Sequence, residues 1–242
     1  MQLALTHFAC PSIEALQAVT LKDPALFRQL LQFLTIPVSE LFRDPPFFLA
    51  LRQQVVPVLL TYPSLKIWVA GYCSGEEVVS LAIVLREEGL LERALIYATD
   101  INPDSLDQAR RGVYRFDTVT GRSAAYLAAG GKRSLADYYT GAYDGAIFNR
   151  SLFENVTFAD HSLATDSVFS ETQLVLCRNV LIYFNKALQD RALGLFHGSL
   201  SHRGFLGLGS KESLEFSRHA DHFETIDKPN RIFRRCQREP VC

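Results

Sequence analysis

The sequence predicts an α/β fold, with a mostly parallel sheet that carries helices on both faces. From Lys66 onward, short apolar runs alternate with segments of helical periodicity. That alternation is typical of a parallel sheet with right-handed crossover connections. The same alternation returns after residue 172. A chain of 242 residues is long enough for one large domain and a small one.

The first part of the chain predicts a short N-terminal helical layer over residues 1–35. Apolar residues recur at helical spacing from 12 to about 34, and Asp23-Pro24 is suited to cap and begin a second helix. We therefore predict two short helices in this layer. A connection over 35–46 and a further helix over 47–60 follow.

The α/β part is predicted from apolar runs that end at a glycine or an aspartate and from helical patterns that follow them. The helix after the first run has two acids in its first turn, where the helix dipole favours them. The predicted strands cover 67–70, 94–99, 173–177 and 205–208, and the predicted helices cover 76–88, 103–111 and 186–199.

Between residues 112 and about 160 the alternation breaks. Glycine-rich turns separate short runs rich in Tyr and Phe, which predicts an inserted antiparallel β-subdomain. Runs at 223–226 and 231–234 predict a terminal hairpin. The predicted second domain is thus 36–242, with the β-subdomain inserted into it.

Composition and charge argue against several classes of function. A net charge of -1 gives no electrostatic case for nucleic acid or an anionic membrane as the main partner. Five scattered cysteines without a C-x-x-C pair indicate reduced thiols and no metal site. No signal peptide or membrane-spanning run is evident, so we expect a cytoplasmic protein. A basic tail, for which a solvated strand is favoured over a binding patch, contains Arg231, Arg234, Arg235 and Arg238.

A glycine loop and an aspartate form the strongest constellation. Gly71-Tyr72-Cys73-Ser74-Gly75 joins a strand to a helix, and Asp100 ends the next strand, where it can accept hydrogen bonds from ribose hydroxyls. The loop lacks the G-x-G-x-x-G pattern, and Glu76 and Glu77 would repel phosphate. A nucleoside ligand with an amine or a sulfonium therefore fits better. The alternative is a plain tight turn with Asp100 as a helix cap.

Four ordered blocks give a more specific signal, because they resemble the motifs of CheR-type chemotaxis receptor methyltransferases. Residues 67–77 resemble W-x-A-G-C-S-T-G-E-E, 40–45 resemble F-F-R-D-P, 98–102 resemble A-T-D-I-N, and 176–184 resemble C-R-N-V-L-I-Y-F. A weaker block at 207–213 is similar to G-x-S-E-S near the family's end.

This resemblance implies a Rossmann-like S-adenosylmethionine methyltransferase sheet. It also implies methyl transfer from S-adenosylmethionine to glutamate carboxylates of chemotaxis-type receptors, with S-adenosylhomocysteine as the product. A glutamate with a pKa of about 4.3 is already ionised at neutral pH, so alignment can replace a general base. The implied partner is a receptor's cytoplasmic domain, with no nucleic acid, no membrane insertion and no required oligomer.

The resemblance also implies roles for individual residues. Arg43 and Tyr183 would lie beside the transferring methyl group, Glu77 would receive the cofactor's amine and Asp100 would hold its ribose. Alternatives are a surface Arg43, a dipole-favoured Glu77, a loop-capping Asn179 and a buried structural Tyr183. The implied cofactor contacts are Ser39, Arg43, Gly71, Glu77, Asp100, Ser162, Leu163, Arg178, Asn179 and Val180.

Departures from the family pattern keep other functions open. Tyr72 places an aromatic ring in the cofactor loop, Ser162 stands where the family usually has Asn, and Ser39 stands for Thr. Tyr72 and Ser162 favour a degenerate module that binds S-adenosylmethionine or partners without catalysis. A methyltransferase for another carboxylate or a small molecule is a second alternative, and a dinucleotide-dependent dehydrogenase a distant third.

The segment 128–141 is longer than in family members that dock on a receptor's C-terminal tether peptide. We therefore expect that this protein does not use such a tether. The N-terminal layer resembles a trimmed form of the family's helical domain, and it is not strongly basic.

Overall fold

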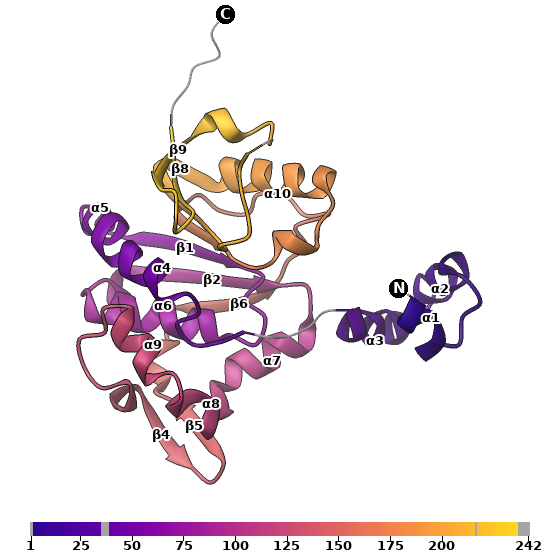
Figure 1. Cartoon of the computed structure of the whole chain (residues 1–242), viewed down its shortest axis with the longest axis horizontal. Coiled ribbons are helices and arrows are strands. Elements are labelled where there is room, and N and C mark those ends of the chain that lie inside the picture. Colours follow the sequence, from indigo (N-terminus) through magenta and orange to yellow (C-terminus); the bar gives the residue numbers. More distant parts are fainter. Residues whose placement is uncertain (1, 35–38, 216, 237–242) are drawn as a thin grey trace, which may run out of the picture. The chain divides into compact units, whose positions relative to one another are not determined.

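The computed structural model describes residues 2–34, 39–215 and 217–236. It divides into two compact units, Met1–Val38 and Ser39–Cys242, which Figure 1 draws in one frame.

The first unit consists of α1 (Gln2–His7), α2 (Ile13–Thr20) and α3 (Pro24–Leu34). Both helices predicted in this layer are confirmed. The side chains of Ser12 and Asp23 accept hydrogen bonds from backbone N–H groups in the first turns of α2 and α3, which satisfies donors that lack a partner within the helix. Helix α1 was not predicted, because six residues are too few to show a clear period.

The second unit is built on a seven-stranded mixed sheet. Its first five strands are parallel, and β10 runs antiparallel to both of its neighbours. The predicted terminal hairpin is thereby confirmed as β9 and β10, and Arg238 of the basic tail lies outside the described residues. The strand order is β6 (Val156–Asp160), β2 (Ala94–Asp100), β1 (Leu65–Ala70), β7 (Thr172–Cys177), β8 (Leu200–Leu208), β10 (Ile232–Arg235) and β9 (Phe223–Asp227).

Helices cover both faces of this sheet, as predicted. Ile67 and Val69 of β1 belong to one hydrophobic cluster with α4 to α7, whereas Trp68 and Ala70 belong to a second cluster with α10 (Figure 1). This follows from the two-residue period of a strand. The helices are α4 (Pro45–Ala50), α5 (Val56–Leu59), α6 (Glu76–Glu87), α7 (Pro103–Arg111) and α10 (Lys186–Ser199), with short 3-10 turns η2 (Leu91–Arg93), η4 (Arg150–Leu152), η5 (Leu181–Tyr183) and η6 (Ala220–His222).

The helix predicted over 47–60 is present but interrupted. Between α4 and α5 the chain forms a π-helical segment, η1 (Leu51–Val55). Pro57 supplies no backbone N–H within this stretch, so a regular ladder of hydrogen bonds cannot continue through it.

The inserted antiparallel subdomain is confirmed, but its predicted end at residue 160 is wrong. Residues 156–160 form β6, which pairs in parallel with β2 at the edge of the main sheet. Edge strands are only partly buried, and β6 therefore has the mixed polarity of the insertion that precedes it. The insertion consists of a sheet in the order β3 (Val113–Arg115), β5 (Gly145–Phe148), β4 (Tyr139–Ala142) with α8 (Phe116–Thr120), α9 (Ser123–Ala128) and η3 (Leu135–Tyr138).

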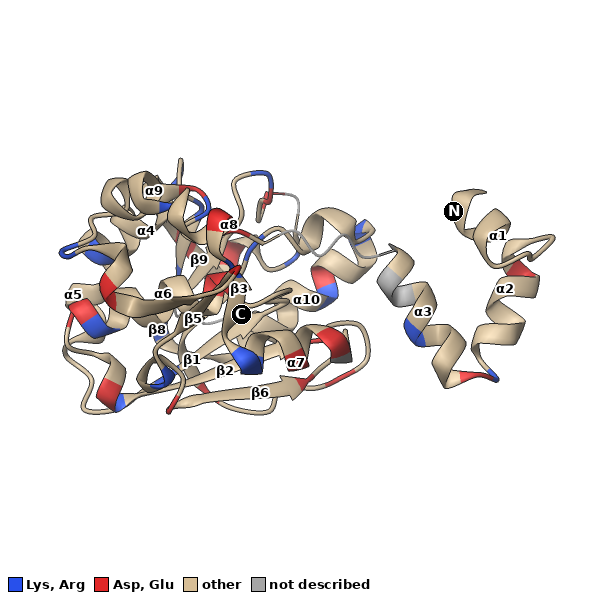
Figure 2. Ribbon diagram, turned by 90° about the horizontal axis from the view of Figure 1, so that it is seen from below, with Lys and Arg blue, Asp and Glu red and all other residues tan. Residues whose placement is uncertain are grey.

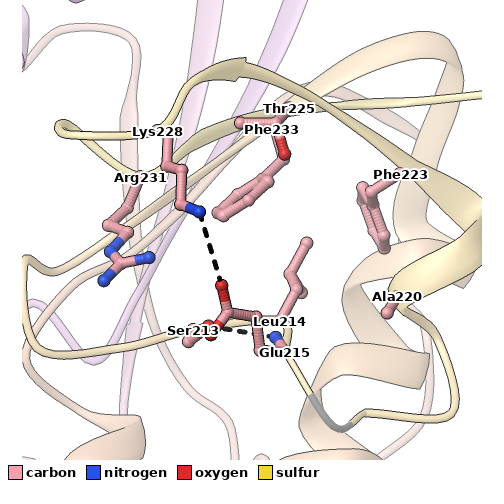
Figure 3. A pocket seen from close by; sticks show the side chains of 9 residues that line it. All are labelled: Ser213, Leu214, Glu215, Ala220, Phe223, Thr225, Lys228, Arg231 and Phe233. Carbon is pink, nitrogen blue, oxygen red and sulfur yellow. Dashed lines mark hydrogen bonds and ion pairs between the residues drawn. The ribbon is translucent and has the colours of Figure 1, made fainter.

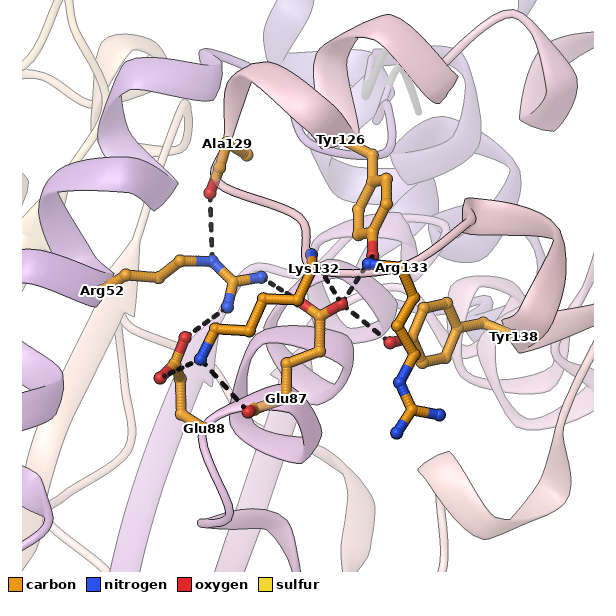
Figure 4. Close-up of polar contacts among 8 residues, drawn as sticks. All are labelled: Arg52, Glu87, Glu88, Tyr126, Ala129, Lys132, Arg133 and Tyr138. Atoms are coloured by element: carbon orange, nitrogen blue, oxygen red, sulfur yellow. Dashed lines mark hydrogen bonds and ion pairs between the residues drawn. The ribbon is translucent and has the colours of Figure 1, made fainter.

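A buried carboxylate anchors the insertion to the main unit (Figure 4). Glu87, at the end of α6, accepts hydrogen bonds from the hydroxyls of Tyr126 at 2.5 Å and Tyr138 at 2.8 Å and from the backbone N–H of Lys132 at 3.1 Å. The guanidinium of Arg52 also pairs with it. Burial raises the pKa of Glu87, but these hydrogen bonds outweigh burial and hold it below the usual value.

Charged side chains of both signs are interspersed over the second unit (Figure 2). Among the helices of the described residues, none has the length and apolar character needed to cross a membrane.

Candidate functional site

The predicted site residues lie at the carboxyl edge of five adjacent parallel strands. Asp100 ends β2, Gly71 follows β1, and residues 178–180 follow β7. Ser162 follows β6 on one side, and the turn 209–212 follows β8 on the other. Ligands of open α/β sheets bind outside this edge.

The loop after β1 has a backbone that needs glycine at its first position. Gly71, Cys73 and Gly75 have φ angles of 73°, 57° and 99°, in the left-handed region. A Cβ atom on Gly71 would lie 2.4 Å from Cγ2 of Val180. The loops after β1 and β7 therefore touch, and glycine is what permits their close approach.

Asp100 fixes this loop. Its Oδ2 accepts a hydrogen bond from the backbone N–H of Cys73 and its Oδ1 one from that of Asn102, each at 2.9 Å. Burial raises its pKa, although these hydrogen bonds act to lower it. The N-cap of α7 is Asn102, so the helix-cap alternative for Asp100 is wrong. Each oxygen of a carboxylate can accept a second hydrogen bond, and Asp100 can thus also receive ligand hydroxyls.

Glu77 carries a buried oxygen that lacks a donor. The side chain is 13% exposed, and Nη1 of Arg178 lies 3.8 Å from Oε1. Among the described residues, none donates a hydrogen bond to this oxygen. Burial is the main reason that the pKa of Glu77 is raised, and the charges of Arg178 and Arg43 oppose it. A buried acceptor of this kind suits a cationic donor such as an ammonium group.

Arg178 links this carboxylate to the turn before α4. It is buried and donates from Nη2 to Oδ2 of Asp44 at 2.8 Å and to the carbonyl of Arg43 at 3.2 Å. Its guanidinium carbon lies 4.1 Å from the ring centroid of Phe47, in cation–π geometry. Arg178 thus holds the 43–47 segment against the floor of the site.

Arg43 sits in a strained turn. Phe42 and Asp44, on either side, have φ angles of 50° and 56°, and such strain persists only where the surroundings hold it. Here Phe42 is fully buried, and its N–H donates to Oγ of Ser80 at 2.9 Å. The charge of Arg43 lowers the pKa of Glu77, which indicates that the two side chains act on the same region.

The hydroxyls of Ser39 and Ser162 have partners within the protein. Ser39 and Ser74 both hydrogen-bond the carboxylate of Glu76, the latter from Oγ to Oε2 at 2.5 Å. Oγ of Ser162 accepts from the N–H of Ala164 at 3.3 Å, which closes a turn in its own loop. Next to it, Leu163 packs in the hydrophobic cluster beneath α10.

The structure also settles how two tyrosines are oriented. The ring of Tyr72 is buried in the core, edge-on to Phe158 with a centroid distance of 5.5 Å, and burial raises the pKa of its hydroxyl. The ring therefore points away from solvent. Tyr183 is 66% exposed, so the alternative of a buried structural tyrosine is wrong.

Glu212 was not identified from the sequence as a residue of the site. Glu212 is buried, and its carboxylate accepts four backbone hydrogen bonds. Oε2 accepts from Asn179 at 3.1 Å and Gly209 at 2.6 Å, and Oε1 from Val180 at 2.8 Å and Leu181 at 2.7 Å. Asn179 takes part in this arrangement through its backbone N–H, and a loop-capping role for its side chain stays a prediction. The weak block at 207–213 contains Glu212, but sequence reasoning assigned it no role, because three of its four partners are main-chain groups 31 to 33 residues away.

Comparison with known proteins agrees with this geometry. Residues 37–232 match the family described as CheR methyltransferase, SAM binding domain. Cher3 of Pseudomonas putida, named provisionally as a methyltransferase, is 65% identical over 96% of this chain and 85% of its own length. The chemotaxis protein methyltransferase of Listeria innocua is 31% identical over 80% and 71%. Chemotaxis protein methyltransferase 1 of Pseudomonas aeruginosa is 30% identical over 91% and 82%. The chain therefore belongs to the CheR family of S-adenosylmethionine-dependent methyltransferases.

Proposed function

We propose that this protein transfers a methyl group from S-adenosylmethionine to glutamate side chains of chemotaxis-type receptors, forming methyl esters. The observation that carries the proposal is the strained turn that bears Arg43. Buried neighbours hold this turn, and the charge of Arg43 acts on Glu77. A guanidinium carried by such a turn can attract and orient a substrate carboxylate. The relatives named as chemotaxis protein methyltransferases support a receptor as the substrate.

The residues at the carboxyl edge fit the cofactor. Gly71 lets the loops after β1 and β7 lie against each other, and Oε1 of Glu77, which accepts no hydrogen bond within the described residues, can accept one from the cofactor's ammonium group. Asp100 keeps acceptor capacity for the ribose hydroxyls. We assign the backbone of residues 178–180 to the floor beneath the cofactor.

When bound, S-adenosylmethionine supplies a methyl group on a positively charged sulfur, and a carboxylate oxygen bonds to this carbon as the C–S electron pair remains on sulfur. The products are a neutral ester and S-adenosylhomocysteine, and no proton moves. The protein's part is then to orient the carboxylate and to exclude water. We assign the orientation of the carboxylate to Arg43 and to Tyr183. Tyr183 is exposed, and its hydroxyl would form a hydrogen-bonding wall beside the carboxylate.

The test is methyl transfer from labelled S-adenosylmethionine to purified cytoplasmic fragments of the source organism's chemotaxis-type receptors. Base-labile label identifies a carboxylate ester. We expect Arg43→Gln to reduce transfer about 100-fold, as for loss of one positioned charge, with a much smaller change in cofactor affinity. Arg111→Gln, which removes an exposed arginine on α7, is the matched control. Cofactor binding by the wild type without base-labile label on any fragment would refute the proposal.

A second candidate is a module that binds S-adenosylmethionine without catalysis. The engagement of the Ser39 and Ser162 hydroxyls within the protein favours it, because two expected cofactor contacts already have partners. Calorimetry discriminates between the candidates when it is combined with the transfer assay. Micromolar binding with transfer supports the enzyme, and binding with no transfer supports the module.

Two further expectations belong to the proposal. A protein that modifies receptor cytoplasmic domains is expected in the cytoplasm. The segment 128–141 is anchored through Lys132 and Tyr138 to Glu87, which supports the expectation that it does not open to receive a tether peptide (Figure 4). Tight, specific binding of a receptor's C-terminal tether peptide would contradict it.

A further inference from the structure

A small pocket lies between the β9–β10 hairpin and residues 213–215 and 220 (Figure 3). One end is apolar, where Leu214, Phe223 and Phe233 line it with at most 8% exposure. The other end is cationic, where Lys228 and Arg231 extend beside each other. The pocket is therefore polarised along its length.

The cationic end lies at the same edge of the sheet as the candidate site. β10 begins beside the end of β8, and the N–H of Leu208 donates to the carbonyl of Arg231 at 3.1 Å. The next residue, Gly209, shares the carboxylate of Glu212 with Asn179. Because neighbouring strands are about 4.8 Å apart, the end of β7 and the start of β10 are separated by about 10 Å.

Arg231 differs from the other described arginines of the basic tail. Arg234 pairs with Glu224, and Arg235 donates to the carbonyl of Leu200. Within the described part of the chain, the guanidinium of Arg231 has neither a hydrogen bond nor an ion pair. Glu215, the acid that lines the pocket, pairs with Lys228, so the guanidinium of Arg231 is available to an external carboxylate.

Lys228 can change partners easily. Its Nζ lies 3.9 Å from Oε1 of Glu215, and the two side chains are 76% and 62% exposed. An exposed pair of this kind contributes only about 0–1 kcal/mol. An incoming carboxylate can therefore recruit Lys228 at little cost.

The volume restricts what the pocket holds. It is about 160 Å³. Sites for cofactors and other small molecules occupy about 300–1,000 Å³. The pocket is thus of a size for one or two side chains and not for a second cofactor.

We propose that this pocket is a docking subsite for the protein substrate, and that it takes an acidic side chain together with a neighbouring apolar one. The carboxylate pairs with Arg231 and Lys228, and the apolar side chain packs between Phe223 and Phe233. The inference rests on the proposed function, because the acidic residue belongs to the segment whose target glutamate lies about 10 Å away at the end of β7.

The pocket can be tested without methyl transfer. We expect N-acetyl-Glu-Leu-amide to shift the backbone amide NMR signals of residues 228–233 saturably at millimolar concentration, and the matched N-acetyl-Gln-Leu-amide to bind more weakly. Arg231→Gln removes the preference for Glu. Arg203→Gln keeps it, because Arg203 has a similar φ of 61° but lies far back along β8, away from the site edge. Equal binding of both ligands to the wild type, or an unchanged preference in Arg231→Gln, would overturn the proposal.

Kinetics provide the second readout. We expect Arg231→Gln to raise KM for a receptor fragment about tenfold, or about 1.4 kcal/mol, with kcat and cofactor affinity unchanged. An unchanged KM would overturn the docking role. If the wild type transfers no methyl group, the proposed function fails, and the docking role fails with it. The peptide titration then still decides whether the pocket selects an acidic side chain.

Discussion

The buried carboxylate of Glu77 lowers the stability of the folded chain but favours the binding of a cationic group. A buried carboxylate with an unfilled acceptor destabilises the folded chain in its ionised form, because desolvation is not repaid. The folded pKa is raised, so the folded chain holds its proton more strongly than the unfolded chain does. The stabilising contribution of the protonated form is lost as the pH rises through this raised value. A cationic ligand group would supply the missing partner.

The substitution Glu77→Gln is therefore expected to weaken S-adenosylmethionine binding at least tenfold, about 1.4 kcal/mol, while the urea midpoint stays the same or rises. Calorimetry and urea unfolding at neutral pH measure the two effects. Glu87→Gln is the matched control, since Glu87 is a well-bonded buried carboxylate with a lowered pKa. It should lose stability and keep cofactor affinity. A destabilised Glu77→Gln with normal binding would show that Glu77 is structural only.

Sequence motifs placed most of the candidate residues at one edge of the sheet, because strand ends can be located from apolar runs. The hydrogen bonds and packing of individual side chains could not be predicted in the same way. The hydroxyl of Ser162 turns back on its own loop, and the ring of Tyr72 enters the core. Both outcomes depend on packing among residues far apart in the sequence.

At the scale of elements, the loops after β7 and β8 act as one unit. The carboxylate of Glu212 is shared by the backbones of residues 179–181 and Gly209, and Val180 in turn contacts Gly71. Displacing this carboxylate would therefore move the floor of the site and the glycine loop together.

In Glu212→Gln, the amide NH₂ faces two backbone donors in either orientation. With about 1–3 kcal/mol for each of the two donors left unsatisfied, we expect the free energy of unfolding to fall by about 2–6 kcal/mol. Cofactor affinity should also fall, as the floor shifts. Urea unfolding with an unchanged m-value measures the first effect and calorimetry the second. Lys211→Gln, at an exposed position in the same turn, should change stability by less than about 0.5 kcal/mol. Equal stability of the two variants would rule out the role assigned to Glu212.

Among the elements, long periodic segments were predicted closely, and α10 (Lys186–Ser199) agrees at both ends. The sequence prediction assigned the edge strand β6 to the insertion, because a partly buried strand shows no clear alternation of apolar and polar residues. The interruption of the 47–60 helix by η1 was also missed. A π-helical turn holds about one residue more than an α-helical turn, and over the five residues of η1 that difference is too small for periodicity to reveal.

At the scale of the whole second unit, the sheet separates two regions with different polar anchors. On one face, the insertion is tied down by Arg52 and Glu87 (Figure 4). On the other, α10 and the C-terminal segment bring together His197, His219 and His222, with ring centroids 4.5 to 6.2 Å apart. The first anchor is an ion pair, whereas the second is a cluster of imidazole rings.

This histidine cluster predicts loss of stability in mild acid. Burial, then the charges of Arg235, His222 and His219, lower the pKa of His197 from 6.5 to about 4. The unfolded chain thus binds a proton first, and stability present above about pH 6.5 is lost as the pH falls towards 4. His197→Phe, whose ring can pack against Phe223, should flatten the dependence between about pH 7 and about pH 5, where most carboxylates remain ionised. Urea unfolding across this range measures it, with His202→Gln, at an exposed histidine, as control. A slope in His197→Phe equal to that of the wild type would place the acid sensitivity elsewhere in the chain.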